Sequence, residues 1–137
     1  MDINGTWYNE LGSIMDLRVS GNVITGKYQT KVGGAPGIYP LTGYLNAPNP
    51  NGIAVGWTVL WNNQLGNKQS LTSWAGQYQL SDGIEEIYTF WLLVRELEHA
   101  EDWEATNIGQ DTFTRNKPSE KMILKAKKRG KFSHPIQ

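Results

Sequence analysis

Hydrophobic and polar residues alternate along most of this chain, in short runs separated by residues typical of turns. In residues 13–19, for example, Met15 and Leu17 fall on one side and Asp16 on the other. Successive residues of a β-strand point to opposite faces, so this pattern predicts half-buried strands. The predicted strands cover residues 5–10, 13–19, 23–32, 38–45, two runs within 56–78, 85–95 and 109–115.

The two runs within residues 56–78 are the most informative, because large and polar side chains alternate in both. Turn formers at residues 62–67 join them into a predicted hairpin. The side chains expected on its inner face are Trp57, Val59 and Trp61 from the first run and Ser70, Thr72 and Trp74 from the second. Indoles and hydroxyls that face inward together are typical of a pocket for a small, partly apolar ligand.

Eight short strands with regular turns predict an all-β fold, an eight-stranded antiparallel up-and-down β-barrel whose closure removes exposed sheet edges. The barrel domain is expected to span residues 1–117. In residues 118–137 we expect a short helix, capped by Ser119 and stopped by Gly130, within a basic and solvated tail.

The predicted strand at residues 85–95 carries apolar side chains on both faces, with Trp91 on the inner face and Phe90 on the outer. A single-layer barrel has nothing of its own outside to cover the outer face. We therefore expect a homo-oligomer in which neighbouring subunits cover it.

The composition narrows the class of protein. A chain of 137 residues suffices for one domain with a core. The 13 basic and 13 acidic residues cancel, which argues against nucleic acid or an anionic membrane surface as a partner. The absence of cysteine excludes disulfides and thiolate metal sites.

No apolar run reaches the length of a membrane span, and the N-terminus lacks a charged and apolar leader. We expect a secreted mature form given a start Met, or alternatively a cytoplasmic protein.

Polar side chains occupy several inward positions of the predicted strands. A buried polar group without a hydrogen-bond partner costs about 1–3 kcal/mol, so these groups need partners. They are Asn9, Ser13, Tyr28, Thr30, Ser70, Thr72 and Asp111. A ligand with one carbonyl, two N–H groups and a carboxylate could satisfy most of them together.

Six short motifs follow one another along the chain: GTWYNELGS at 5–13, TGKY at 25–28, GWTV at 56–59, SWAGQY at 73–78, WLL at 91–93 and GQDTFT at 109–114. Their order and spacing resemble the avidin/streptavidin family of biotin-binding proteins, closer to streptavidin and the bacterial or fungal members than to egg-white avidin. The resemblance runs from about residue 5 to residue 118. It implies a non-enzymatic, secreted barrel that sequesters biotin tightly and non-covalently, with one site per subunit of a tetramer.

The resemblance also implies the site residues. Those that match donors to the ureido oxygen of biotin are Asn9, Ser13 and Tyr28, and those that match acceptors for the ureido nitrogens are Thr30 and Asp111. Those that match contacts to the thioether sulfur and the carboxylate are Thr72, Ser70 and the backbone N–H of Gly34. Those that match aromatic walls are Trp61, Trp74, Trp91 and, lent to a neighbouring subunit, Trp103. Leu11 and Val32 are implied as further lining, as is Trp57, which could equally fill the core.

Some positions depart from the streptavidin pattern. Gly34 replaces an asparagine, which keeps the backbone N–H but predicts a looser loop over the pocket. Gln110 replaces a histidine and Phe90 replaces a glutamine, both at outward positions, so we expect different contacts between subunits. A dimer or a larger assembly are therefore alternatives to the tetramer. The segment after Pro118 lies outside the resemblance, and occupation of a pocket by residues 132–137 is a further hypothesis.

Two other functions fit less well. A glycoside hydrolase needs two inward carboxylates, but Glu10 and Asp16 have outward positions, which leaves Asp111 alone. His99 and His134 fall in an expected loop and tail without a nucleophile or carboxylate beside them, so neither a triad nor a metal site is complete. A carrier of another small apolar molecule would explain the barrel and the tryptophans but not the inward polar set. We expect no cofactor, with biotin as the ligand.

Overall fold

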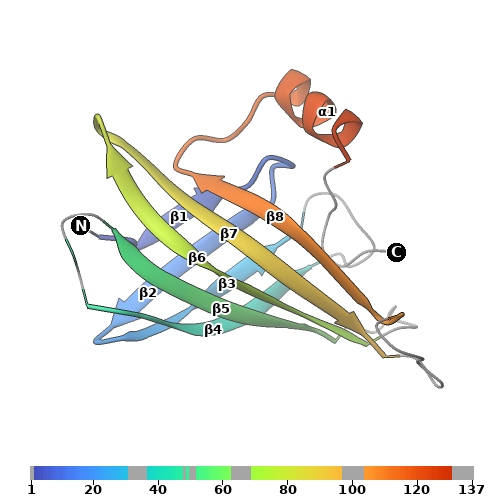
Figure 1. Ribbon diagram of the computed structural model, residues 1–137, viewed down its shortest axis with the longest axis horizontal. Coiled ribbons are helices and arrows are strands. Elements are labelled where there is room, and N and C mark those ends of the chain that lie inside the picture. Colours follow the sequence, from blue (N-terminus) through green and yellow to red (C-terminus); the bar gives the residue numbers. More distant parts are fainter. Residues whose placement is uncertain are drawn as a thin grey trace.

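The computed structural model describes residues 2–30, 37–47, 49, 52–62, 69–96 and 104–130. In these residues eight antiparallel strands follow each other in sequence order and close into a barrel, and one helix follows them (Figure 1). The strands are β1 (Gly5–Tyr8), β2 (Ile14–Ser20), β3 (Val23–Gln29), β4 (Ile38–Leu45), β5 (Ile53–Trp61), β6 (Ser70–Ser81), β7 (Ile84–Arg95) and β8 (Thr106–Thr114), and the helix is α1 (Glu120–Lys128). The predicted fold is confirmed.

The alternation seen in the sequence sets which side chains fill the barrel. Along β5 buried residues alternate with more exposed ones, and β6 continues the pattern. The pairing register then places Trp57, Trp74 and Trp91 side by side on β5, β6 and β7. All three indoles belong to the cluster of buried side chains that fills the interior. The barrel therefore has an aromatic core that runs across three neighbouring strands.

Several strands differ in length from those predicted. β1 ends at Tyr8 because the chain turns immediately afterwards, with Gly12 at a φ of 82° and its N–H bonded to the Asn9 carbonyl at 3.1 Å. β6 runs on to Ser81, where Asp82 and Gly83 form a two-residue turn with φ values of 52° and 76°. Positive φ at both positions suits a tight hairpin and is typical of an Asp-Gly pair.

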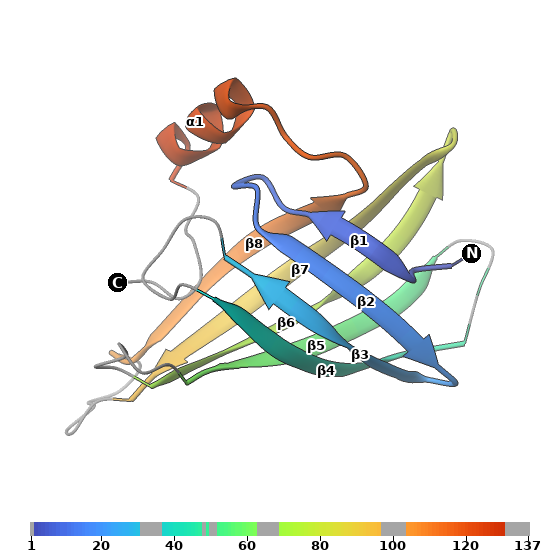
Figure 2. The ribbon, with the colours of Figure 1, turned by 180° about the vertical axis from the view of Figure 1, so that it is seen from behind.

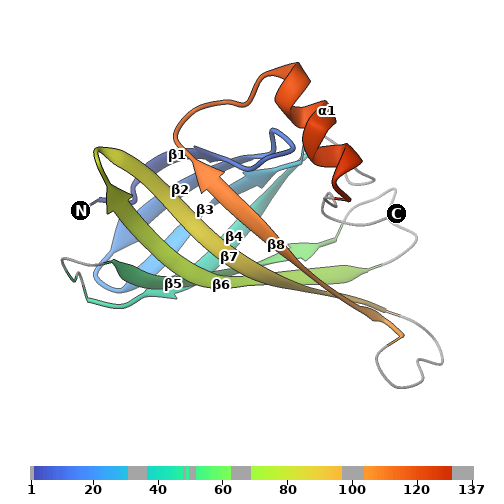
Figure 3. The same ribbon diagram turned by 45° about the horizontal axis from the view of Figure 1, so that its top comes forward.

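Helix α1 begins at the predicted cap. The Ser119 Oγ accepts a hydrogen bond from the Met122 N–H at 3.2 Å, and Gly130 follows the helix at a φ of 80°. Figures 2 and 3 both show α1 lying beside the loop between β1 and β2, at one end of the barrel. No helix in the described part of the chain is long and apolar enough to cross a membrane.

The seam between β1 and β8 closes the barrel with few ladder contacts. The register pairs only Tyr8 with Thr114 among the described residues. Beyond the end of β1, the Glu10 carboxylate accepts a hydrogen bond from the Thr112 N–H at 2.6 Å and so extends the seam. The Glu10 side chain thus supplies a hydrogen bond between the two sides of the seam where the ladder has none.

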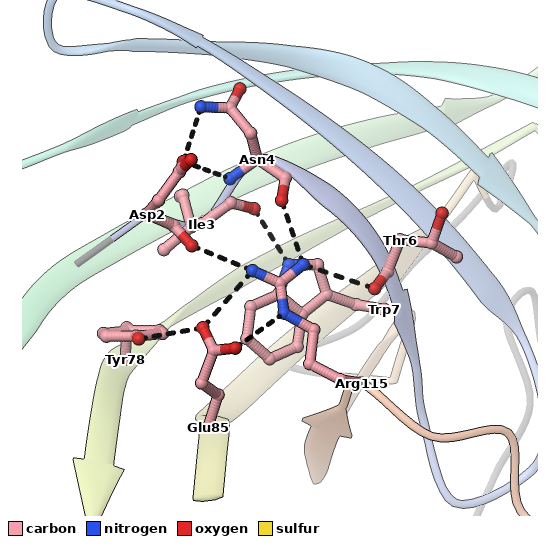
Figure 4. Close-up of polar contacts among 8 residues, drawn as sticks. All are labelled: Asp2, Ile3, Asn4, Thr6, Trp7, Tyr78, Glu85 and Arg115. Carbon is pink, nitrogen blue, oxygen red and sulfur yellow. Dashed lines mark hydrogen bonds and ion pairs between the residues drawn. The ribbon is translucent and has the colours of Figure 1, made fainter. Parts of the chain in front are cut away.

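Arg115 binds the chain on both sides of this seam (Figure 4). Its guanidinium forms an ion pair with Glu85 at 3.3 Å and lies 3.8 Å from the centroid of the Trp7 ring. The carbonyl oxygens that accept its N–H groups are those of Asp2, Asn4 and Thr6, at 2.8, 3.0 and 3.4 Å. One cation therefore links the N-terminal segment to β7 and to the end of β8.

The outer surface of β6, β7 and β8 is apolar, as predicted for the strand at residues 85–95. Phe90 is 63% exposed and Ile108 is 70% exposed. The other large apolar side chains exposed at outward positions of these three strands are Leu71, Ile84, Tyr88, Leu92 and Val94. This surface has no cover within the described chain.

Candidate ligand-binding site

The loop between β1 and β2 presents the Asn9 amide to the barrel interior. Its oxygen accepts hydrogen bonds from the N–H groups of Leu11 and Ser13, both at 3.0 Å. Its nitrogen donates to the Tyr28 hydroxyl at 3.3 Å. Because the oxygen is held by the loop, the amide nitrogen faces inward, and Asn9, only 2% exposed, can act as a donor there.

Ser13 and Tyr28 lie beside Asn9 and are fully buried. Burial raises the pKa of Tyr28 well above its usual value, the Asp111 carboxylate adds to the increase, and the nearby Ser13 hydroxyl opposes it. Tyr28 is therefore a neutral O–H donor at physiological pH. The Ser13 Oγ lies near this hydroxyl, yet no described group completes a hydrogen bond of good geometry with it.

The tryptophans form the walls of the interior. Trp57 stacks on Trp74, with ring centroids 5.9 Å apart and planes inclined by 24°. The ring centroid of Tyr28 lies 5.1 Å from that of Trp74. It lies 5.6 Å from that of Trp61, and these two rings meet edge to face. Indoles held in this way present flat, apolar surfaces whose positions are fixed by their neighbours.

Asp111 lies on β8 and points into the barrel, where it is 2% exposed. Its Oδ2 accepts a hydrogen bond from the Trp74 Nε1 at 2.9 Å, and its backbone carbonyl accepts one from the Thr89 hydroxyl at 2.8 Å. A carboxylate can accept several hydrogen bonds at once, so Asp111 can hold the indole and still receive an N–H from a ligand.

Strand β6 carries two further hydroxyls on its inner face. The Thr72 Oγ1 accepts a hydrogen bond from the Trp61 Nε1 at 2.8 Å. The Ser70 Oγ is buried and has no partner among the residues that the structure describes, and the same holds for the Trp57 Nε1. Together with the Ser13 Oγ, these atoms are buried polar groups that a bound molecule could satisfy.

Every predicted site residue within the described ranges is buried in the barrel or in the loop between β1 and β2. These residues are Asn9, Leu11, Ser13, Tyr28, Thr30, Trp61, Ser70, Thr72, Trp74, Trp91 and Asp111. Val32, Gly34 and Trp103 lie outside the described residues. The assigned contacts to a ligand remain predictions.

The sequence did not single out two residues that support these side chains. Tyr39 packs edge to face on Trp61, with centroids 5.0 Å apart, and the Thr89 hydroxyl anchors the strand at Asp111. Both have inward parity on their strands, which was the available signal. Parity alone could not show which neighbours they would contact.

A separate hollow of about 700 Å³ lies outside the barrel, between α1, the start of β7 and the end of β8. Its lining includes Glu86, Lys117, Met122 and Arg129, and it contains no tryptophan. It is therefore distinct from the aromatic interior. Within the described ranges, no three His, Asp or Glu side chains gather closely enough to hold a metal ion.

The fold and its interior define an all-β barrel with aromatic walls and fixed polar groups. The chain belongs to the avidin family, whose profile matches residues 1–116, and this is a family of non-enzymatic binding proteins. This chain is 37% identical over 124 residues to avidin-related protein 4/5 of Gallus gallus. The match covers 82% of this chain and 77% of that protein.

Two other relatives match a similar share of this chain. Afifavidin of Afifella pfennigii is 33% identical over 119 residues, covering 82% of this chain and 68% of that protein. Fibropellin-1 of Strongylocentrotus purpuratus is 34% identical over 123 residues, and the match covers 86% of this chain but 11% of that protein. This chain therefore spans only a small part of fibropellin-1.

Proposed function

We propose that this protein binds biotin non-covalently and with high affinity, one molecule in each barrel. The observation that carries the proposal is the set of buried polar atoms without described partners, Ser13 Oγ, Ser70 Oγ and Trp57 Nε1, in a barrel whose interior is lined by tryptophans. Each such atom costs about 1–3 kcal/mol when it stays unpaired, and a polar ligand would remove that cost. Membership of the avidin family supports biotin as that ligand.

The ureido end of biotin would lie against the loop between β1 and β2. Asn9 Nδ2, the Ser13 hydroxyl and the Tyr28 hydroxyl would donate to its oxygen. Thr30 and Asp111 would accept its two N–H groups. Three donors on one carbonyl oxygen draw electron density towards it, which makes the ring nitrogens better donors to Asp111.

The rest of the ligand would extend away from this loop. The proposed contacts of its apolar part are Trp61, Trp74, Trp91 and Leu11, with Thr72 near the thioether sulfur. The proposed contacts of its carboxylate are Ser70 and the Gly34 N–H, with Val32 beside them. Because the polar groups are already held by the barrel, binding needs little ordering, and high affinity is expected.

We further propose that the protein is a homo-oligomer, with a tetramer as the expected form. The exposed apolar surface of β6 to β8, with Phe90 63% exposed, supports this proposal because such surfaces usually contact another chain. Trp103 would reach into the site of a neighbouring subunit. Secretion is likewise a proposal. The closer likeness to streptavidin than to egg-white avidin is a proposal too: the Gallus gallus relative is 37% identical to this chain and the Afifella pfennigii relative 33%.

The test is a titration with biotin that is monitored by tryptophan fluorescence and by calorimetry. The mass of the assembly is measured separately under native conditions. We expect saturation at one biotin per chain with a shifted emission, and a mass of four chains. A folded barrel whose emission stays constant up to millimolar biotin would contradict the proposed ligand. A monomer mass would contradict only the assembly.

Phe90→Glu tests the assembly more directly, with Leu124→Glu as the control. Both side chains are exposed, at 63% and 54%, but Leu124 lies on α1 rather than on the sheet. A charge placed in an apolar interface lacks a partner, so Phe90→Glu should reduce the native mass and Leu124→Glu should not.

A further inference from the structure

Helix α1 follows the region that the avidin family profile matches, since the match ends at residue 116 and the helix spans Glu120–Lys128. Nevertheless it contacts the loop that carries the proposed ureido donors. A Cβ built on Gly12 would lie 3.0 Å from the Ile123 Cδ1, so the tip of the Ile123 side chain lies directly over the Gly12 backbone. The helix thus touches the centre of the loop between β1 and β2.

Gly12 suits this contact in two ways. Its φ of 82° is a left-handed conformation that favours glycine. The absence of a Cβ also leaves room for the Ile123 methyl group, because a contact at 3.0 Å is too close for an ordinary side-chain carbon. Local backbone geometry and the packing of α1 therefore require the same residue.

Most of α1 is exposed, and only a narrow side of it is covered. The hollow of about 700 Å³ separates part of the helix from the start of β7 and the end of β8, and its lining includes Asn9, Glu10 and Ala126. On the helix, Met122 and Leu124 are exposed at 61% and 54%, whereas Ile123 is half-buried and Ala126 is buried. Ile123 and Ala126 are thus the least exposed side chains of the helix.

Hydrogen bonds of Asn9 hold the two ends of the loop together. Besides the two hydrogen bonds to the Asn9 Oδ1, the Asn9 N–H donates to the Ser13 carbonyl at 3.2 Å and the Gly12 N–H to the Asn9 carbonyl at 3.1 Å. Leu11 is buried here, yet it lies outside the cluster that fills the barrel. Two hydrogen bonds tie the loop to the barrel, from Asn9 Nδ2 to the Tyr28 hydroxyl and from the Thr112 N–H to Glu10, and neither involves Leu11 or Gly12. Packing of Ile123 on Gly12 therefore acts on the part of the loop that these bonds do not hold.

We propose that Ile123 is a positioning residue. By packing on Gly12 it holds the loop of residues 9–13 against the barrel, and so keeps the Asn9 amide and the Ser13 hydroxyl directed at the ligand. The consequence for biotin rests on the proposed function. The consequence for the order of the loop does not, because it can be measured without any ligand.

The first experiment measures amide hydrogen exchange of the ligand-free protein by NMR. Ile123→Val removes only the methyl group that reaches Gly12, and Ile123→Ala removes more. We expect the Leu11 and Ser13 amides to exchange about tenfold faster in Ile123→Ala and to a smaller extent in Ile123→Val, with the amides of β6 and β7 unchanged. Ile123→Leu keeps a δ-carbon and should restore slow exchange.

Leu124→Ala is the matched control, because it truncates an exposed side chain on the same helix. If Leu124→Ala accelerates the loop amides as much as Ile123→Ala, the effect belongs to helix stability and the proposal is wrong. Unchanged exchange at Leu11 and Ser13 in both Ile123 variants would also overturn it. Ile123→Val removes one methyl group and leaves the rest of the helix sequence intact, so the test holds even if Ile123→Ala unfolds α1.

The second experiment measures the rate of biotin dissociation. Ile123→Ala should release biotin roughly threefold to tenfold faster than the unchanged protein, while Leu124→Ala and Ile123→Leu should match it. Equal dissociation rates in all variants would contradict the positioning role. If the unchanged protein binds no biotin, the proposed function fails, while the exchange experiment still decides whether Ile123 orders the loop.

Discussion

The Trp74 Nε1 donates a hydrogen bond to the Asp111 Oδ2 at 2.9 Å, which joins β6 to β8 across the inner face of β7. The bond fixes the orientation of an indole that also stacks on Trp57 and contacts Tyr28. It also holds a carboxylate at a point where it can receive a ligand N–H. One interaction thus shapes both an apolar wall and a polar contact of the proposed site.

Asp111→Ala should weaken biotin binding by about 2–4 kcal/mol, because a charge-assisted hydrogen bond is lost and the Trp74 indole loses its partner. Asp111→Asn is the matched control, since it keeps the shape and one acceptor oxygen but removes the charge, and we expect a smaller loss. Titration calorimetry measures both. Equal affinity of Asp111→Ala and the unchanged protein would refute the assignment of Asp111.

Ser13→Ala should separate ligand binding from stability. The Ser13 Oγ has no described partner of good geometry in the ligand-free barrel, so its removal should leave the melting temperature unchanged or raise it. The same variant should bind biotin about 1–2 kcal/mol more weakly, because a donor to the ureido oxygen is gone.

Thr89→Val is the comparison for Ser13→Ala. The Thr89 hydroxyl donates to the Asp111 carbonyl at 2.8 Å, so this variant leaves a buried acceptor without its donor and should lower the melting temperature. Calorimetric melting of the ligand-free proteins checks both predictions. A Ser13→Ala protein that melts as early as Thr89→Val would show that Ser13 is structural.

We expect the fold to lose stability in strong base, because two of its tyrosines have a raised pKa. Burial, followed by the hydrogen bond to Glu85, raises the pKa of Tyr78 to about 12, and burial raises the pKa of Tyr28 well above its usual value. An unfolded tyrosine titrates near a pKa of about 10, so above that pH the unfolded chain holds fewer protons than the folded one. The stabilisation is complete below pH 10 and is lost as the pH rises towards 12.

Denaturant unfolding at pH 8, 10 and 11 measures this loss. Tyr78→Phe removes one of the tyrosines with a raised pKa and should make the free energy of unfolding fall less steeply above pH 10. A slope that is equally steep in Tyr78→Phe would rule out Tyr78 as a source of the dependence.

Arg115→Ala should destabilise the fold by about 2–4 kcal/mol, because the seam between β1 and β8 loses an ion pair, a cation–π contact and several carbonyl partners. Arg115→Lys keeps the charge but cannot reproduce the planar fork of donors, so most of the loss should remain. Denaturant unfolding measures both variants. Full stability of Arg115→Lys would show that charge alone closes the seam.

Local rules determined a large part of this fold. Alternation of apolar and polar residues fixed which side chains of β2, β5 and β6 face inward, because parity in a strand does not depend on distant neighbours. The start of the helix at Ser119 and its end at Gly130 were also predictable, because capping depends on the local backbone and not on distant neighbours. The inward parity of Asn9, Ser13 and Asp111 was likewise available from the sequence.

Only the tertiary structure decided which distant groups meet. The strand register, set by the closure of the barrel, places the Trp74 indole against Asp111, and the return of the chain after β8 places Arg115 over Trp7. The tail was expected to be solvated, yet Ile123 packs on Gly12. These contacts join residues far apart in the chain, and their formation depends on the closure of the barrel and the path of the tail, which no local pattern encodes.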